Sequence, residues 1–578
     1  MYIKKHSSRF RAVFFLFVFL FAFLLLRLVS IHFFRASYLE AMANKQHNLF
    51  LELPPTRGTI FDRNLRPLSL NLPAYSLYAV PPRIKDKPAA IENLISLTGL
   101  NKEFLEERLN RKKSFIWLAR KLPMTTVDKI KRMKIDGLGF IKESKRYYPN
   151  SLLAAHVIGF SDVDNRGLEQ LELTYDNYLK GASGWCMVKR DARQRELLLE
   201  RSFIPPKDGY DLVLAIDTTI QFIAEKELDA AFKKHHANGA SIIIINPYSG
   251  EILALANRPT FDLNNYKDTN TESRRNRAIC DMFEPGSVFK IVTASAALAE
   301  NRVTENDKFF CENGQYQVAN HILHDHTPHG ILTFREVIEQ SSNIGTTKVA
   351  QKLGPQIIYQ YEKLFGFGDL TKVDLPGEVR GVVIKPAAWS KTSIGAVPIG
   401  QEVGVTAIQL VTAISAIANG GYYVRPFVVK SVQDKHGELI KEFKPTVAKR
   451  VISADIASRI KSIITGAVER GTGKLARPPS FTAAGKTGTA QKVEPNGTYS
   501  QTKFFASFIG FVPADNPQIA MAVVFDEPHP SHFGGTVAAP VFAKVAENVL
   551  KYLQSTKQEI PKSIEDAHPK ETLARLRQ

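Results

Sequence analysis

Residues 283–298 read FEPGSVFKIVTASAAL, and this stretch decides the fold that the sequence predicts. Its Pro-Gly pair interrupts the chain directly before Ser287, and the run that follows suits a helix that is apolar on nearly every face. Such a helix is expected to be buried. Because Ser287 and Lys290 are three residues apart, they lie on one face of it, about one turn from each other.

A serine beside a buried lysine is a candidate for nucleophilic catalysis. A hydroxyl is a poor nucleophile at neutral pH, so it needs a base within hydrogen-bond reach. Lys290 can serve as that base if burial lowers its pKa. The unpaired N–H groups at the helix start also allow the backbone amide of Ser287 to bind a developing oxyanion.

The spacing of Ser287 and Lys290 is not specific by itself. Ser458 with Lys461 and Ser500 with Lys503 match it too. Ser458 follows a helical run and is expected inside a helix, whereas Ser500 is expected in a polar loop. Short motifs of this kind often arise by coincidence, so the prediction needs further support.

Two further motifs supply that support. Residues 341–343 read SSN after a helical stretch, and they offer hydroxyls and an amide. Residues 486–489 read KTGT within a strand predicted for 484–493, with both threonines on one face and a glycine that leaves room for a ligand. Taken singly, the first motif is better explained as a helix-capping loop and the second as an ordinary strand interrupted by a glycine. The candidate catalytic residues are Ser287, Lys290, Ser341, Asn343 and Lys486, and the candidate substrate-binding residues are Thr487, Gly488 and Thr489.

The three motifs, in this order, resemble those of the penicillin-binding proteins and serine β-lactamases. The resemblance covers nearly the whole chain. Residues 57–64, 146–149 and 167–169 are similar to the N-terminal pedestal of the class B penicillin-binding proteins. Residues 284–287, 341–345, 366–368, 374–378 and 533–540 are similar to the division-specific branch of that class. Asn343 in place of Asp favours this branch over the elongation branch, although sporulation-specific relatives share much of the pattern.

The resemblance implies an α+β fold: a transpeptidase domain with an antiparallel sheet and helices, on an elongated α+β pedestal of the dimerisation type. It also implies a D,D-transpeptidase that forms an acyl-enzyme on Ser287 with peptidoglycan stem peptides ending in D-Ala-D-Ala, in septal wall synthesis at cell division. β-Lactams are expected to acylate the same serine. No cofactor and no metal are implied, and the expected partners are a membrane glycan polymerase and other division proteins.

The N-terminus predicts a membrane anchor. Four basic residues precede the stretch 12–34, whose only charge is Arg27, and a helix of this length spans roughly 34 Å. The basic flank places residues 1–11 in the cytoplasm and the catalytic part outside the membrane. A cleaved signal peptide is the alternative, but Ala41-Met42-Ala43 lies far beyond the apolar run. Arg27 is interpreted as snorkelling to a headgroup, or as facing a partner helix.

The exported part is expected to form two domains. Residues 43–206 are predicted to be the pedestal, with a helical stretch at 91–111, and 207–553 the transpeptidase domain, with 554–578 as a flexible tail. Within the second domain the expected elements are strands at 212–216, 240–245, 251–256, 506–512 and 519–525 and helices at 218–234 and 538–552. Residues 246–250 are expected to form the turn of a hairpin.

The net charge and the cysteine spacing bear on nucleic-acid binding, metal sites and disulfides. A net charge of +19 suits anionic lipid or wall polymer, and no nucleic-acid-binding motif accompanies it. Cys186, Cys280 and Cys311 lack metal or disulfide spacing, although an exported chain permits one pair.

Four other functions share part of this pattern. A β-lactamase would lack the anchor and the pedestal. A bifunctional glycosyltransferase would need a polymerising domain of its own, and residues 43–206 are too few to form one. A D,D-carboxypeptidase, which differs only in its acceptor, and an anchored division scaffold remain open.

Overall fold

The computed structural model describes residues 3–113, 115–190, 196–197, 203–556, 560–568 and 573. The chain forms two compact units, one made of 1–56 and 181–209 and the other of 57–180 and 210–578. The pedestal expected at 43–206 is therefore divided: its middle part belongs with the unit that carries the three motifs. The strand pairing and hydrogen bonds described below supply the physical reason.

The smaller unit contains the predicted anchor. An apolar helical segment, Ser8–Phe34, has a mean hydropathy of 2.8 and is long enough to cross a membrane. A short antiparallel sheet pairs β6 with β1, β7 and β8. The elements of this unit are α1 (Ile3–Val29), η1 (Ser30–Phe34), α2 (Ala36–His47), β1 (Asn48–Leu53), β6 (Gly184–Arg190), β7 (Glu196–Leu197) and β8 (Phe203–Ile204).

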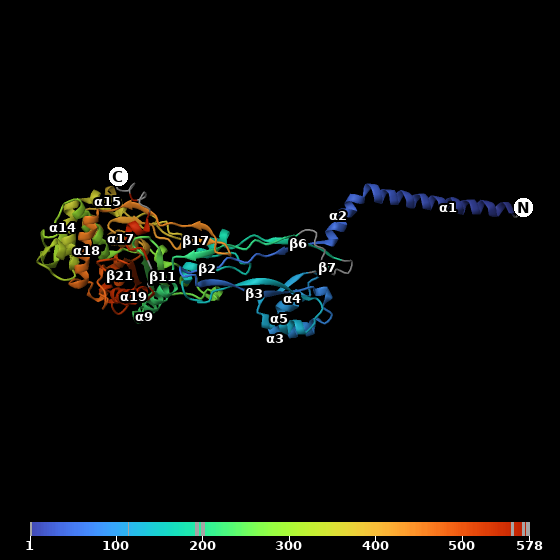
Figure 1. Ribbon diagram of the computed structural model, residues 1–578, viewed down its shortest axis with the longest axis horizontal. Coiled ribbons are helices and arrows are strands. Elements are labelled where there is room, and N and C mark those ends of the chain that lie inside the picture. Colours follow the sequence, from blue (N-terminus) through green and yellow to red (C-terminus); the bar gives the residue numbers. More distant parts are fainter. Residues whose placement is uncertain are drawn as a thin grey trace. The chain divides into compact units, whose positions relative to one another are not determined.

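In the larger unit, residues 67–147 form a small layered head (Figure 1). Strands β3 (Pro67–Ala79), β4 (Ile116–Leu122) and β5 (Leu138–Tyr147) are antiparallel and bury one face under helices. Those helices are α3 (Lys87–Thr98), α4 (Lys102–Leu109) and α5 (Met124–Arg132). The single helical stretch expected at 91–111 is wrong, because Gly99 ends α3 in the left-handed conformation and Asn101 caps α4.

The sheet of the head continues into the rest of the larger unit. Its strand order is β18-β17-β9-β2-β3-β4, with β5 also on β3 and with β2 parallel to β9. The strands not yet bounded are β2 (Ile60–Phe61), β9 (Asp211–Leu214), β17 (Val429–Gln433) and β18 (Leu439–Glu442). Three short helices follow β5 in the sequence: α6 (Ala155–Ile158), α7 (Gln170–Thr174) and α8 (Asp176–Leu179).

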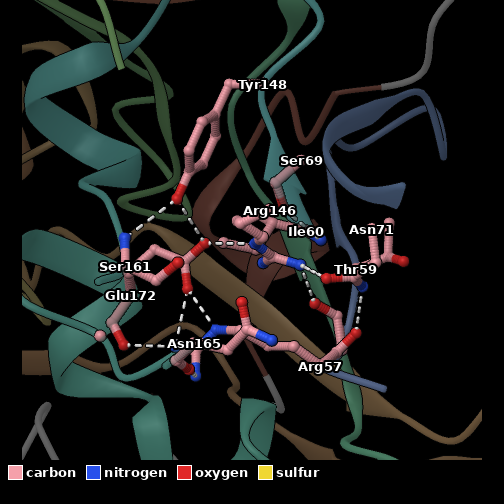
Figure 2. Close-up of polar contacts among 12 residues, drawn as sticks. Arg57, Thr59, Ile60, Ser69, Asn71, Arg146, Tyr148, Ser161, Asn165 and Glu172 are labelled. Carbon is pink, nitrogen blue, oxygen red and sulfur yellow. Dashed lines mark hydrogen bonds and ion pairs between the residues drawn. The ribbon is translucent and has the colours of Figure 1, made fainter. Parts of the chain in front are cut away.

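A buried ionic network holds these segments together (Figure 2). The Glu172 carboxylate is fully buried and accepts hydrogen bonds from Arg57 Nε and Arg146 Nε, each at 2.7 Å, and from the Tyr148 hydroxyl at 3.1 Å. Arg57 also donates to Asp176 at 2.6 Å. The network joins residues up to 119 positions apart within 57–180. This segment is held to the rest of the larger unit by the parallel pairing of β2 with β9 and by two hydrogen bonds from Thr218 to Asp62 Oδ2.

The main sheet has the strand order β11-β10-β22-β21-β20 and is antiparallel. Its strands are β10 (Gly239–Ile245), β11 (Ile252–Arg258), β20 (Ala484–Val493), β21 (Tyr499–Val512) and β22 (Ile519–Asp526). Helices α9 (Thr218–Lys234) and α19 (Gly534–Thr556) lie together on one face (Figure 1), and α17 (Ala407–Ala418) packs on the other. Alternate side chains of each strand therefore enter two separate apolar cores.

The predicted α+β fold is confirmed, including the hairpin of β10 and β11 and the bounds of α9. Asn246 Oδ1 accepts from the backbone N–H of Tyr248 and of Ser249, which forms the expected turn. The remaining elements are η2 (Pro81–Arg83), η3 (Tyr266–Asp268), α10 (Thr271–Arg274), α11 (Arg277–Cys280), η4 (Gly286–Phe289), α12 (Lys290–Ala299), β12 (Lys308–Phe310), η5 (Glu312–Gly314), β13 (Gln315–Val318), β14 (His321–His324), β15 (Ile331–Thr333), α13 (Phe334–Glu339), α14 (Asn343–Leu353), α15 (Pro355–Leu364), η6 (Pro386–Ala388), α16 (Ser393–Ala396), η7 (Val397–Ile399), β16 (Tyr422–Val424), β19 (Val447–Arg450), α18 (Ala454–Glu469), η8 (Lys474–Ala476) and α20 (Ile564–Ala567).

The C-terminal region differs from the expected flexible tail after residue 553. Helix α19 runs to Thr556, and Ile564 and Leu573 join a buried cluster with β16 and β19. His568 Nε2 lies 2.8 Å from the carbonyl oxygen of Tyr248. Apolar residues spaced along an otherwise polar segment are enough to dock it on the domain.

Two of the three cysteines can be placed. Cys280 is half-buried and Cys311 is buried, and both are free thiols. The side chain of Cys186 lies outside the described residues.

Candidate active site

Ser287 lies in η4, the short 3-10 turn that leads into α12, and is half-buried. The turn packs directly on strand β20. Gly286 has a φ of +57°, and a Cβ atom there would lie 2.7 Å from the carbonyl oxygen of Thr489. Only glycine permits both this conformation and this approach, which explains the residue before the serine.

Lys290 is the first residue of α12, one turn after Ser287, and is fully buried. Its Nζ donates to the Ser341 carbonyl oxygen at 2.6 Å, to Ser341 Oγ at 3.2 Å and to Asn343 Oδ1 at 2.7 Å. Burial, together with the charge of Lys486, lowers the pKa of the Lys290 amine well below its ordinary value. A lysine in this state can accept a proton at neutral pH.

The second motif, residues 341–343, forms the turn between α13 and α14. Ser341 has a φ of +62°, which is unusual for a residue with a Cβ and directs its hydroxyl toward the two lysines. Ser342 caps α14 by accepting from the Gly345 N–H at 2.9 Å. Ser342 therefore has the helix-capping role, and Ser341, its neighbour in the same turn, is the candidate catalytic residue.

The third motif lies on β20, which has the bounds predicted for it. Lys486 is fully buried, its Nζ donates to Ser341 Oγ at 2.9 Å, and burial lowers its pKa to about 7. A Cβ at Gly488 would lie 2.3 Å from Ser507 Oγ and 2.8 Å from the Pro285 carbonyl oxygen. Glycine is thus required for close packing against η4, in addition to any room it leaves for a ligand.

Both threonines of the third motif are anchored by residues that the sequence analysis did not select as site residues. Thr487 Oγ1 lies 2.7 Å from Thr472 Oγ1. Thr489 Oγ1 accepts from the Gly534 N–H at 3.1 Å. Thr472 carries no motif of its own, so the sequence held no signal for it.

The structure brings four of the predicted residues into one hydrogen-bonded cluster: Lys290, Ser341, Asn343 and Lys486. Two amines with lowered pKa values surround one hydroxyl, an arrangement suited to moving protons. Among the described residues, β20 is the last strand of its sheet, so its outer edge can pair with an extended peptide.

The two other Ser-x-x-K matches lie elsewhere. Ser458 is inside α18, as expected, whereas Ser500 is near the start of β21 and not in a loop. The described part of the chain contains no cluster of three or more His, Cys, Asp or Glu side chains that could hold a metal ion.

Comparison with known domain families agrees with this geometry. The penicillin-binding protein transpeptidase domain matches residues 240–547, and the penicillin-binding protein dimerisation domain matches residues 52–214. The fold is thus that of a penicillin-binding transpeptidase.

Individual relatives narrow the class. Stage V sporulation protein D of Bacillus subtilis is 34% identical over 536 residues, which cover 91% of this chain and 83% of that protein. The peptidoglycan D,D-transpeptidase FtsI of Escherichia coli is 31% identical over 510 residues, or 86% of this chain and 84% of that protein. The crystal structure of penicillin-binding protein 3 of Mycobacterium tuberculosis with aztreonam superposes with a TM-score of 0.69, at 28% identity, and covers 89% of this chain and 99% of that one. The chain belongs to the class B penicillin-binding proteins and is an enzyme, a D,D-transpeptidase.

Proposed function

We propose that this protein cross-links peptidoglycan stem peptides through an acyl-enzyme on Ser287. The observation that carries the proposal is the cluster in which Lys290 and Lys486 both donate to Ser341 Oγ. Lys290 itself lies one turn along the chain from Ser287. Ser287 Oγ attacks the carbonyl carbon of the penultimate D-Ala of a stem ending in D-Ala-D-Ala. The bond to the terminal D-Ala breaks, and the serine proton passes by way of Lys290 and Ser341 to the leaving amine.

The other motif residues hold the substrate. Lys486, Thr487 and Thr489 bind the terminal carboxylate through charge-assisted hydrogen bonds, and Asn343 holds the peptide backbone. The backbone N–H groups of Ser287 and Thr489 form the oxyanion hole. The close packing of Gly488 against the start of η4 supports this assignment, because a Cβ at Gly488 would lie 2.8 Å from the Pro285 carbonyl oxygen.

An amine from a neighbouring stem completes the reaction by attacking the acyl-enzyme. If water replaced the amine, the same site would act as a D,D-carboxypeptidase. Incubation with a D-Ala-D-Ala stem peptide, with and without an amine acceptor, distinguishes the two. A cross-linked product beside released D-Ala supports the transpeptidase, and D-Ala without cross-linked product supports the carboxypeptidase.

The nucleophile is tested by acylation with a labelled penicillin, comparing the wild type with Ser287→Ala in detergent-solubilised full-length chain. Intact mass should show one persistent adduct on the wild type and none on the variant. An adduct that survives Ser287→Ala would reject the assignment. Persistence of the adduct also argues against a β-lactamase, which must hydrolyse it rapidly.

The cellular role proposed is septal wall synthesis at cell division, supported by the similarity to FtsI. A second candidate is wall synthesis during sporulation, because the sporulation protein is 34% identical over 91% of the chain. A fluorescent fusion decides between them: enrichment at midcell in dividing cells supports the first, and enrichment only around a forming spore supports the second.

Residues 1–11 are proposed to be cytoplasmic, with 12–34 as a single-pass anchor and the catalytic domain outside the membrane. The flanking basic residues and the apolar helix Ser8–Phe34 support this orientation. Protease added to intact spheroplasts should then degrade the catalytic domain and spare an N-terminal tag. The proposed protein partners are a membrane glycan polymerase and other division proteins, which co-purification with the tagged chain would identify.

A further inference from the structure

A carboxylate outside the three motifs lies directly behind the second one. Asp325 follows strand β14, and its Oδ1 accepts from the Asn343 N–H at 2.5 Å and from the Ile344 N–H at 3.1 Å. Its Oδ2 accepts from Ser342 Oγ at 2.6 Å. One side chain thus binds three consecutive residues of the turn that contains the proposed catalytic groups.

These hydrogen bonds fix a strained segment. Ser341 is in the left-handed region, so the turn needs contacts from elsewhere to keep its shape. The carboxylate binds the first N–H groups of α14, where a negative charge is favourable. Further along, the backbone carbonyl of His324 accepts from Asn343 Nδ2 at 2.9 Å. The segment 324–325 therefore holds both the backbone and the amide group of Asn343.

Asp325 also sets the electrostatic surroundings of Lys290. After burial, Lys486 is the charge that most lowers the pKa of Lys290, and Asp325 is the group that raises it. Besides the two lysines and Asp325, the buried thiol of Cys311 is a titratable group of the described residues in contact with this turn. Its Sγ lies 3.4 Å from Ser342 Oγ, and the charge of Lys348 acts on it. His324 and His326 flank Asp325 in sequence.

We propose that Asp325 is a positioning residue for acyl transfer: its carboxylate fixes the Ser341–Asn343 turn and supplies the negative charge that opposes Lys486 at Lys290. The inference rests on the proposed function, because it assigns Lys290 as the base that takes the proton of Ser287. Asp325 binds Ser342 Oγ and the N–H groups of Asn343 and Ile344, in the turn whose Ser341 and Asn343 hold Lys290. It acts through that turn and is therefore not itself catalytic.

The substitution Asp325→Asn removes the negative charge of the side chain and keeps its shape. The amide is isosteric, its oxygen can still accept from the Asn343 and Ile344 N–H groups, and its NH2 group can donate to Ser342 Oγ. The negative charge is lost, so the protonated form of Lys290 is less favoured and the pKa of Lys290 falls further. Because acylation needs neutral Lys290, the acid limb of the acylation rate should move to lower pH. The plateau rate should fall on the order of tenfold, because a weaker base transfers the proton less effectively and charged hydrogen bonds are lost.

The experiment measures the second-order rate of acylation by a labelled penicillin between about pH 5 and 9, the range over which a lysine with a lowered pKa changes charge. The full-length chain is used in detergent, and melting temperatures are recorded in parallel. Asp325→Ala removes both charge and hydrogen bonds and should lose more of the rate and also melt lower. Asp434→Asn is the matched control, because Asp434 likewise accepts from backbone N–H groups, of His436 and Glu438, on an exposed turn.

The position of the acid limb in the pH profile of the acylation rate decides the test. A shift to lower pH in Asp325→Asn, absent from Asp434→Asn, supports the proposal. A rate that falls with no shift would indicate a purely structural residue and overturn it, as would a variant with wild-type rate and profile. Ser287→Ala is run beside them: loss of its adduct together with wild-type behaviour of Asp325→Asn rejects only this inference, whereas an adduct on Ser287→Ala rejects the proposed function itself.

Discussion

Replacing Glu172 by Gln should destabilise the larger unit strongly, because this carboxylate neutralises two buried guanidinium groups. Arg57 and Arg146 each donate to it through Nε at 2.7 Å, and both Arg57 and Glu172 are almost completely buried. Arg57 keeps its bond to Asp176, whereas Arg146 would face only neutral oxygens such as that of Gly58. Breaking a buried pair by removing one partner costs about 3 to 5 kcal/mol.

This loss converts to a measurable shift in melting temperature. The larger unit has about 490 residues. At about 2.1 cal/mol/K of unfolding entropy per residue, 1 kcal/mol corresponds to about 1 °C, so Tm should fall by roughly 3 to 5 °C. The control is Glu107→Gln, which breaks the exposed ion pair between Glu107 on α4 and Arg111 and should lower Tm by about 1 °C or less. The assay is thermal unfolding of the detergent-solubilised chain, followed by near-ultraviolet circular dichroism.

The pH dependence gives an independent check. Although burial alone would raise the pKa of Glu172, the charges of Arg146 and Arg57 outweigh it and hold the pKa below its ordinary value. A group with a depressed folded-state pKa stabilises the fold above its unfolded pKa and loses that contribution as pH falls through the folded value. The Tm difference between wild type and Glu172→Gln should therefore be full at pH 7 and shrink in acid below about pH 4. Equal Tm values for Glu172→Gln and Glu107→Gln at pH 7 would refute the reasoning.

Three predictions concern the site. Lys290→Met should reduce acylation by labelled penicillin by about 10²- to 10⁴-fold, the usual contribution of a general base, with Tm unchanged or raised, and near-normal acylation would exclude Lys290 as the base. Lys486→Met removes the charge that lowers the pKa of Lys290, so the acid limb of the acylation rate should move to higher pH, opposite to Asp325→Asn, and a shift to lower pH would contradict the assignment. Gly534→Ala would place a Cβ 2.2 Å from the Gly488 carbonyl oxygen, so β20 must move and both Tm and acylation should fall; a variant with wild-type values would show that this contact is not required.

Local features of the fold were predictable from the sequence where the pattern itself carried the structure. The hairpin at 240–258, the helix from Thr218 and the strand from Ala484 follow from apolar periodicity and turn residues. The helical stretch at 91–111 failed because the helix-ending role of Gly99 was not weighed. The docked segment near Ile564 failed because a short polar stretch gives little sign of the surface that buries it.

The sequence alone predicts the apolar N-terminal helix, the α+β class and the residues of the three motifs, because each depends on the order and spacing of neighbouring residues. Only the tertiary structure decided which of them meet and what surrounds them. Lys486 reaches Ser341 across 145 positions, and Glu172 reaches Arg57 across 115. Such contacts are fixed by the packing of the whole unit, and so are the burial and neighbouring charges that lower the pKa of Lys290. A short stretch of sequence specifies a side chain, whereas its proton affinity depends on the distant residues that exclude water and place charges beside it.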